Sequence, residues 1–250
     1  MTGVCARLLV ISLLAAACGE ARGGEATAPA HSPRQLIVSI DLSASQSDGR
    51  RAAARKALDL IIDELQYGDQ LVLVQVHQRS AAEDDVGRWA ETVPLPRDGR
   101  EPTSLDRERR EAVKQAARSV AQTMFAQESA GQLPNTDIMS TMHIAAEYMR
   151  DAGSRLTTLV LLSDMLQSAG GIEMARPGGT PDARWIERQQ ASGLLPRLDG
   201  ACVAVIGADA TTPNGIAVRD FWRQFFEAAG ASLDEDNYRL ITTDRGTLRC

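Results

Sequence analysis

Four short apolar runs, widely spaced along the chain, constrain the fold more than any other feature of the sequence. The runs are Leu36–Ile40, Leu71–Val76, Leu159–Leu162 and Ala201–Ile206. They show little polar alternation, which is typical of strands covered on both faces. Helical patterns separate them, so strand and helix alternate and the sheet should be mostly parallel. The sequence therefore predicts a doubly wound α/β fold with a central, Rossmann-like sheet flanked by helices.

The segments between these runs carry apolar residues at helical spacing. The predicted helices extend over Ala54–Leu65, Leu105–Met124, Ile138–Met149 and Ile216–Phe226, with a brief one around Asp182–Gln190. Arg88–Leu95 has no helical pattern and contains a proline, so we expect it to form one antiparallel edge strand after a hairpin. The aromatic residues of the last helix are predicted to pack in the core.

Composition limits the number of domains and the kind of partner. The chain has 250 residues, of which 44% are hydrophobic, and this is enough for a single large core. We expect one domain over residues 35–245 and a short tail over residues 246–250. Asp and Glu number 33 against 27 Lys and Arg, and the basic residues are scattered. Nucleic acid is therefore not expected as a partner.

The first residues predict an exported protein. Residues 1–17 contain one arginine followed by an apolar stretch from Leu8 to Ala17, which is typical of a signal peptide and too short for a membrane anchor. Leu14–Cys18 resembles a bacterial lipobox, which implies acylation of Cys18. Residues 18–34 are rich in Gly, Ala and Pro, as expected for a flexible tether. We expect a lipid anchor at the outer membrane or the periplasmic face; the alternative is a soluble periplasmic or secreted protein.

Cysteine usage agrees with export. Cys5 would be lost with the signal and Cys18 lipidated, which leaves Cys202 and Cys250. These two residues could pair as a disulfide in an oxidising compartment. The alternative is that Cys202, inside an apolar run, is a small buried hydrophobic residue.

Oxygen-bearing side chains gather where two of the predicted strands end. Asp41, Ser43 and Ser45 stand at alternate positions after the first apolar run, so they begin on one side of the chain. Thr136 lies in a loop before a helix, and Asp164 follows the third run. Ligands of open parallel sheets bind beyond the carboxyl ends of the strands, so all five residues should meet at one rim. Such ligands suit Mg²⁺, with Mn²⁺ and Ca²⁺ as alternatives.

This set of residues resembles the metal-ion-dependent adhesion site of von Willebrand factor A domains, and the resemblance extends over about residues 35–245. It implies that Ser43, Ser45 and Thr136 bind the metal through their hydroxyls. It also implies that Asp41 and Asp164 act mostly through bound water. The simpler interpretation of the first three residues is a strand-to-helix turn with a serine cap.

Two departures from the family concern the loops around these ligands. The family often has glycines before the threonine, where this chain has Pro134 and Asn135, and a glycine after the last aspartate, where it has Met165. These departures affect the loop backbone more than the ligands. Asp137 is expected to cap the following helix.

The resemblance implies a binding function. Three neutral hydroxyl ligands leave most of the cation's charge uncompensated, so the site attracts one more anion. In the family this anion is an Asp or Glu carboxylate of a partner protein. We therefore expect a divalent-cation-dependent, protein-binding module tethered in the bacterial envelope.

Two other functions have some support in the sequence. The fold could be a structural scaffold of an envelope or secretion assembly, in which metal only stabilises loops. A phosphatase of the haloacid dehalogenase type would use an aspartate in the position of Asp41 as its nucleophile. Such an enzyme requires a second aspartate two residues later, where this chain has Ser43. Motifs such as G-x-S-x-G, H-E-x-x-H and the P-loop are missing from the sequence, so no enzymatic activity is expected.

Overall fold

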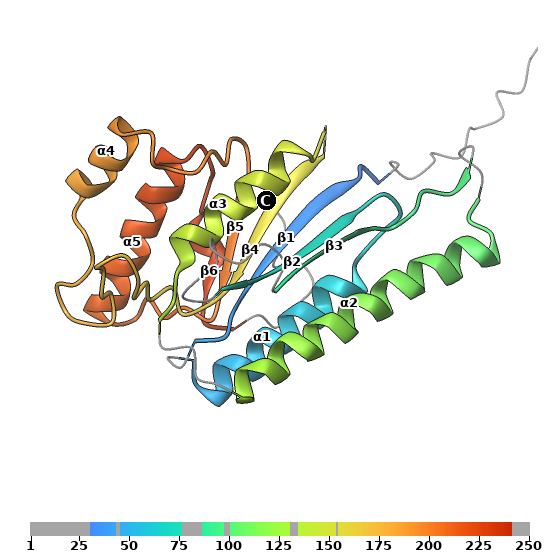
Figure 1. Ribbon diagram of the computed structural model, residues 1–250, viewed down its shortest axis with the longest axis horizontal. Helices are drawn as coiled ribbons and strands as arrows, with labels where there is room; N and C mark the ends of the chain where they lie inside the picture. Colours follow the sequence, from blue (N-terminus) through green and yellow to red (C-terminus); the bar gives the residue numbers. More distant parts are fainter. Residues whose placement is uncertain are drawn as a thin grey trace, which may run out of the picture. The chain divides into compact units, whose positions relative to one another are not determined.

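A six-stranded sheet forms the centre of the part of the chain that the structure, a computed structural model, describes (Figure 1). The described residues are 31–43, 46–76, 87–97, 101–130, 135–153 and 155–241, without the side chains of 127–130. The strands are β1 (Arg34–Asp41), β2 (Gln70–Val76), β3 (Arg88–Thr92), β4 (Leu156–Leu162), β5 (Cys202–Ile206) and β6 (Tyr238–Arg239). Their order across the sheet is β3-β2-β1-β4-β5-β6.

The sheet is parallel except at one edge. β1 pairs in parallel with β2 and β4, and β5 pairs in parallel with β4 and β6. β3 pairs with β2 in the antiparallel direction. This confirms the predicted doubly wound sheet with one antiparallel edge strand. The prediction missed β6, because a strand of two residues has no apolar run that could indicate it.

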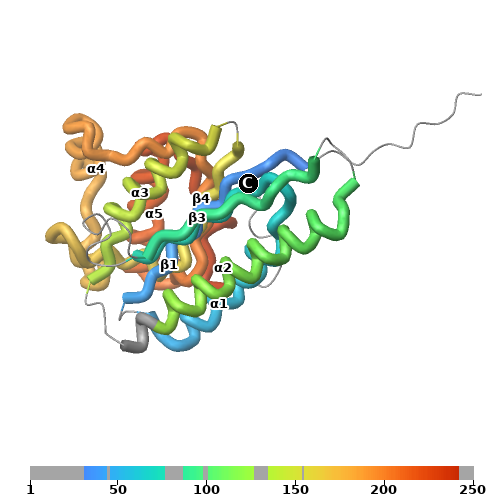
Figure 2. The backbone as a smooth tube through the Cα atoms, turned by 45° about the vertical axis from the view of Figure 1, so that its right-hand side comes forward, coloured from blue at the N-terminus to red at the C-terminus, as the bar shows by residue number. Residues whose placement is uncertain are grey.

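Five α-helices of the described chain cover the two faces of this sheet. They are α1 (Asp48–Asp63), α2 (Ser104–Ala130), α3 (Ile138–Arg150), α4 (Ala183–Ala191) and α5 (Pro213–Ala228). α1 and α2 lie side by side on one face, and α3, α4 and α5 lie on the other (Figures 1 and 2). In β1, Val38 and Ile40 pack toward α1 and α2, whereas Ile37 packs toward the opposite face. Both faces are buried, which explains the unbroken apolar runs of the sequence.

Side-chain caps define where several helices begin. The hydroxyl of Ser47 accepts a hydrogen bond from the backbone N–H of Arg50 at the start of α1. Thr212 caps α5 in the same way, and Pro213 occupies the first turn of that helix. The carboxylate of Asp137 accepts from Ser140 N at 3.1 Å, which confirms its predicted role as the cap of α3.

The aromatic side chains of α5 lie in the core, as the sequence predicts. Phe221, Trp222, Phe225 and Phe226 are all buried. Their rings pack against one another with centroid distances between 5.2 and 6.3 Å. Such contacts add to the free energy gained from burying their apolar area.

Cys202 in β5 is buried and disulfide-bonded. It is therefore more than a small hydrophobic residue of the core. The other cysteines, Cys5, Cys18 and Cys250, lie outside the described residues, so the pairing with Cys250 stays a prediction. The signal peptide, the acylation of Cys18, most of the tether and the tail over residues 246–250 also lie outside the described residues.

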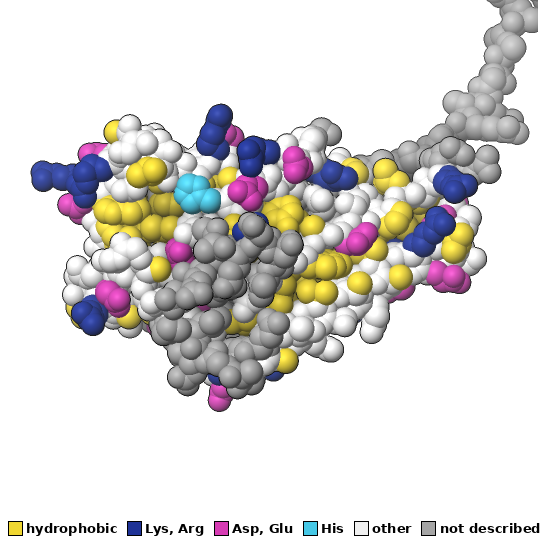
Figure 3. Space-filling model, in the orientation of Figure 1, with side chains coloured by type: hydrophobic (Ala, Val, Ile, Leu, Met, Phe, Trp, Pro, Cys, Tyr) yellow, Lys and Arg dark blue, Asp and Glu magenta, His cyan; other side chains and the backbone are white. Residues whose placement is uncertain are grey.

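The surface carries charges of both signs. On the face seen in Figure 3, acidic and basic side chains of the described residues are interspersed among apolar ones. Within the described ranges, no helix combines the length and the apolar character needed to cross a membrane.

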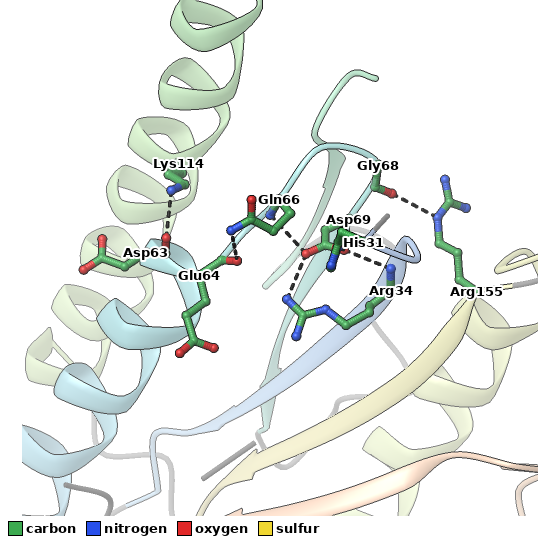
Figure 4. A network of polar contacts seen from close by, with 9 residues as sticks. All are labelled: His31, Arg34, Asp63, Glu64, Gln66, Gly68, Asp69, Lys114 and Arg155. Atoms are coloured by element: carbon green, nitrogen blue, oxygen red, sulfur yellow. Dashed lines mark hydrogen bonds and ion pairs between the residues drawn. The ribbon is translucent and has the colours of Figure 1, made fainter. Parts of the chain in front are cut away.

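A buried carboxylate ties together the amino-terminal ends of the neighbouring strands β1 and β2 (Figure 4). Asp69 Oδ2 accepts hydrogen bonds from Arg34 Nη2 at 2.9 Å and from Gln66 N at 3.1 Å. Its Oδ1 accepts from Arg34 N at 2.9 Å and lies 2.7 Å from His31 Nε2. Burial by itself would raise the pKa of Asp69, but the hydrogen bonds from Arg34, His31 and Gln66 outweigh it and lower the pKa below 3.8.

We expect Asp69→Asn to destabilise the protein by about 2 kcal/mol at neutral pH, since the amide cannot accept all of these hydrogen bonds and leaves Arg34 without its anion. The folded-state pKa of Asp69 is depressed, so its contribution is complete above the unfolded value of 3.8 and is lost as the pH falls through the folded-state pKa. Urea denaturation of wild type and variant at a series of pH values checks this. A stability gap that stays constant down to pH values well below 3.8 would contradict it.

Candidate metal site

The candidate site lies at the carboxyl ends of the neighbouring strands β1 and β4. From these two strand ends the chain continues to opposite faces of the sheet. β1 continues into α1 on one face, and β4 is followed by α4 on the other. The parallel register pairs Ile40 with Leu162, so the next residues, Asp41 and Ser163, stand side by side at the carboxyl edge. This is the switch point of a doubly wound sheet, where such folds bind ligands.

Asp41 is buried at this edge and accepts three hydrogen bonds from other described residues. Its Oδ1 accepts from Ser43 N at 2.9 Å. Its Oδ2 accepts from the hydroxyl of Ser163 at 2.6 Å and from Gln46 Nε2 at 3.1 Å. Since both oxygens are already engaged by the protein, the carboxylate is oriented and suited to contact a cation through water.

Asp164, the second carboxylate, follows Ser163 and is only 4% exposed. Its Oδ1 accepts a hydrogen bond from Leu166 N at 3.1 Å. Its Oδ2 lies 3.6 Å from Nη1 of Arg50, which extends from the first turn of α1. Ser163, which donates to Asp41, is the residue directly before Asp164, so the two carboxylates are linked through this one loop, and Arg50 lies beside Asp164.

Met165, which stands where the family that the site resembles often has a glycine, has a left-handed backbone conformation. Its φ is 65°, in the left-handed region, which costs a side-chain-bearing residue about 1 kcal/mol. The Met165 side chain is fully buried, and its carbonyl accepts a hydrogen bond from Trp222 Nε1 at 2.8 Å. These contacts offset the strain, so the loop keeps its left-handed residue without a glycine.

A glycine in the neighbouring strand end leaves room for this loop. Gly207, directly after β5, has a φ of 113°, and an added Cβ would lie 2.9 Å from the carbonyl oxygen of Ser163. The Ser163 N–H donates to the carbonyl of Ile206 at 3.0 Å, which holds the two segments together.

Thr136 is buried in the loop before α3, and its backbone is hydrogen-bonded to the loop after β4. Its N–H donates to the hydroxyl of Ser168 at 2.8 Å, and its carbonyl accepts from Ser168 N at 3.0 Å. The side chain of Gln167 accepts from Ile138 N at 2.8 Å and donates to Asp137 Oδ1 at 3.1 Å. Side-chain hydrogen bonds thus fix a loop that lacks the family's glycines.

Of the five predicted ligands, the structure describes four. Asp41, Ser43 and Asp164 lie at the carboxyl edge of β1 and β4, and Thr136 is bound to the loop that follows Asp164. All four are buried. Ser45 lies outside the described residues.

The donor set is chemically suited to a hard cation, because it contains only hydroxyl and carboxylate oxygens. Among the described residues no group of three or more His, Cys, Asp or Glu side chains could hold a metal ion. A cation here would therefore depend on hydroxyl ligands. Both carboxylates are oriented by hydrogen bonds from the protein, which fits the indirect role that the resemblance implies.

The charges near the rim shift the pKa values of two further residues, Tyr238 and Asp209. Burial raises the pKa of Tyr238 in β6 and the negative charge of Asp164 raises it further, so the phenol stays protonated at neutral pH. Hydrogen bonds from Thr211 lower the pKa of Asp209, and the positive charge of Arg50 contributes in the same direction. Asp209 is therefore an anion on the loop between β5 and α5.

Several residues of the site were not predicted from the sequence. Ser163 had a signal, since the residue before Asp164 aligns with Asp41 once the strands are paired in register. Gln46, Arg50, Gln167 and Ser168 had none, because their contacts depend on the path of the loops.

Comparisons with known proteins yield no family. No protein-family model matches the chain, and no curated protein matches it. The solved structures with similar folds include proximal thread matrix protein 1 from the mussel byssus, with 15% identity and a TM-score of 0.43 over 87% of this chain. They also include an aerotolerance-related membrane protein from Bacteroides fragilis NCTC 9343, with 12% identity and a TM-score of 0.39 over 82% of this chain and 93% of that one.

A third similar structure is the human COPII-coat protein Sec24c, with 13% identity and a TM-score of 0.39 over 84% of this chain. The chain spans 44% of the mussel protein and 30% of the human protein. With sequence identities of 12–15% and TM-scores of 0.39–0.43, these similarities do not indicate a function for this chain. What the structure itself defines is a doubly wound α/β protein with a buried polar site at its switch point.

We expect Ser163→Ala to destabilise the protein by about 1–3 kcal/mol, because it removes the donor to Asp41 and the acceptor of the Met165 N–H at 2.9 Å. Ser39→Ala in β1 is the matched control: its buried hydroxyl has no hydrogen-bond partner among the described residues, so its loss should be neutral or slightly stabilising. Urea denaturation of the three proteins provides the comparison. Equal losses in both variants would show that the Ser163 hydrogen bonds contribute nothing.

Proposed function

We propose that this protein is a divalent-cation-dependent binding module for a carboxylate of a partner protein, held in the bacterial envelope. The observation that carries the proposal is the convergence of Asp41 and Asp164 at the switch point, each buried and each oriented by hydrogen bonds. A pair of buried carboxylates beside hydroxyl-bearing residues is the arrangement that the resemblance to an adhesion site predicts.

Each residue has a defined role in the proposal. Ser43, Ser45 and Thr136 would contribute hydroxyl oxygens, and Asp41 and Asp164 would orient bound waters. When bound, the cation supplies a largely uncompensated positive charge with one open coordination position for the partner's carboxylate. Mg²⁺ is the expected cation, with Mn²⁺ and Ca²⁺ as alternatives.

The environment of Asp41 supports binding over catalysis. A phosphatase nucleophile needs a carboxylate oxygen directed at the substrate, whereas both oxygens of Asp41 accept hydrogen bonds from the protein. The second acidic residue of such an enzyme is replaced by Ser43. Steady turnover of a generic phosphate ester, lost in Asp41→Asn, would instead favour a hydrolase.

The envelope location rests on the sequence before the described domain. Residues 1–17 predict a signal, Cys18 an acylation site, and residues 18–34 a flexible tether. The last part of this predicted tether belongs to the folded domain, because His31 and Arg34 contact Asp69 and Arg34 begins β1. A tethered domain could reach partners at a distance from the membrane. The alternative location is the periplasm or the exterior, without an anchor.

Calorimetric titration tests the cation. We expect wild type to bind Mg²⁺ and Mn²⁺, and Asp41→Ala and Ser43→Ala to bind at least about tenfold more weakly, because one removes an orienting carboxylate and the other a hydroxyl ligand. Circular dichroism and urea denaturation establish that the variants are folded. The prediction is wrong if folded wild-type protein binds neither cation.

Capture of partners from an envelope extract tests the binding function. We expect proteins retained in the presence of Mg²⁺ to be released by EDTA and to be lost with Ser43→Ala, because the partner's carboxylate would have no cation to bind. Ser39→Ala serves as the control and should retain the same proteins. Retention that is unchanged by EDTA and by Ser43→Ala would instead support a scaffold in which metal plays no part in binding.

A further inference from the structure

Arg50 places a positive charge of the chain itself at the candidate metal site. It lies in the first turn of α1, and its Nη1 is 3.6 Å from Asp164 Oδ2. We propose that Arg50 competes with the cation for Asp164: its guanidinium balances the carboxylate in the cation-free protein and withdraws when a divalent cation binds. This inference rests on the proposed metal site and adds a residue that sets its affinity.

The competition concerns one particular oxygen. Asp164 Oδ1 accepts a hydrogen bond from Leu166 N, so it is turned toward its own loop. Oδ2 is the oxygen that Arg50 approaches. A water bound to a cation would have to donate to this carboxylate in the region that the guanidinium occupies.

Burial explains why a positive charge is needed there at all. The side chain of Asp164 is 1% exposed, and an ionised carboxylate is costly to bury without a compensating charge. The side chain of Arg50 is 28% exposed, so it can exchange its contact with Asp164 for solvent. The anion is thus fixed, whereas its counter-ion can move.

A second anion lies within the electrostatic reach of Arg50. The positive charge of Arg50 contributes to lowering the pKa of Asp209, whose main stabilisation comes from Thr211. Thr211 donates to Asp209 through its N–H at 2.8 Å and through its hydroxyl at 2.7 Å, which holds the carboxylate in place. When Arg50 leaves Asp164, Asp209 offers an alternative partner at the rim, and this makes the withdrawal less costly.

The functional consequence is a threshold for the cation. A divalent ion brings twice the charge of the guanidinium and accepts more oxygen ligands, so it displaces Arg50 once its concentration is high enough. A monovalent ion has no such advantage. Arg50 therefore lowers the affinity for Mg²⁺ and favours divalent over monovalent cations.

Calorimetric titration of the full chain with Mn²⁺ and with Mg²⁺ tests the proposal. We expect Arg50→Gln to bind either cation about tenfold more tightly than wild type, which corresponds to about 1.4 kcal/mol. Arg50→Lys keeps the positive charge and should stay close to wild type. Arg55→Gln is the matched control: it removes the same charge from the same helix, but Arg55 lies over the ring of Phe125 at 4.9 Å and should not affect the site.

Thermal unfolding gives a second measurement. Without divalent cations, Arg50→Gln should have a lower Tm than wild type, because Asp164 loses its counter-ion. The increase in Tm on adding Mn²⁺ should be larger in Arg50→Gln than in wild type.

The outcomes separate this inference from the proposed function. Equal or weaker binding by Arg50→Gln, in a wild type that does bind cations, would overturn the inference and leave the metal site standing. Equally tighter binding by Arg55→Gln would also overturn it, since the effect would then follow net charge. If neither wild type nor Arg50→Gln binds Mn²⁺, both the metal site and the competition are wrong.

Discussion

The parallel pairing of β1 with β4 is the constraint on which the rest of the structure depends. It joins two strands that are distant in sequence, and its register sets Asp41 beside Ser163. The hydrogen bond between their side chains then links the β1 loop to the β4 loop. Because the chain leaves β1 and β4 toward opposite faces of the sheet, the loops separate beyond this bond and leave the polar rim between them.

The two ends of the sheet use buried charge in different ways. At the amino-terminal ends of the strands, Asp69 is surrounded by donors from Arg34, His31 and Gln66 and ties the start of β1 to the start of β2. This arrangement closes that end of the fold. At the carboxyl ends, Asp164 is paired with an arginine that also reaches solvent. The first network stabilises the sheet, whereas the second leaves a contact that can be exchanged.

The fold could be predicted from the sequence because a strand that is buried on both faces consists of an unbroken run of apolar residues. The run from Leu36 to Ile40 indicated β1 for this reason. β6 left no such mark, since its two residues are held by pairing with β5 and not by a pattern of their own. The caps at Asp137 and Thr212 were also predictable, because a single side chain beside a helix start determines them.

The candidate site was predictable only as far as it depends on strand ends. Asp41 and Asp164 follow apolar runs, so their meeting at one edge followed from the parallel sheet. The contacts of Gln167 and Ser168 depend on the course of two loops, which no local pattern encodes. Met165 shows the same limit: the sequence suggested a departure from the family, but the left-handed backbone is kept by burial and by the Trp222 hydrogen bond.

The protein's own hydrogen-bond donors and Arg50 already stabilise the charges of Asp41 and Asp164, and this affects the role that a bound cation would have. Asp41 accepts three hydrogen bonds from described residues, and Asp164 accepts one from a backbone N–H and has a guanidinium 3.6 Å from its other oxygen, so the protein itself compensates part of the charge of both carboxylates. In structural metal sites, by contrast, the binding free energy is part of the folding free energy. A site that is already balanced without its cation can be filled and emptied while the sheet stays intact. Under the proposed function, reversible occupancy of this kind would suit a partner-binding surface, because the affinity for a partner's carboxylate would then depend on the local concentration of the cation.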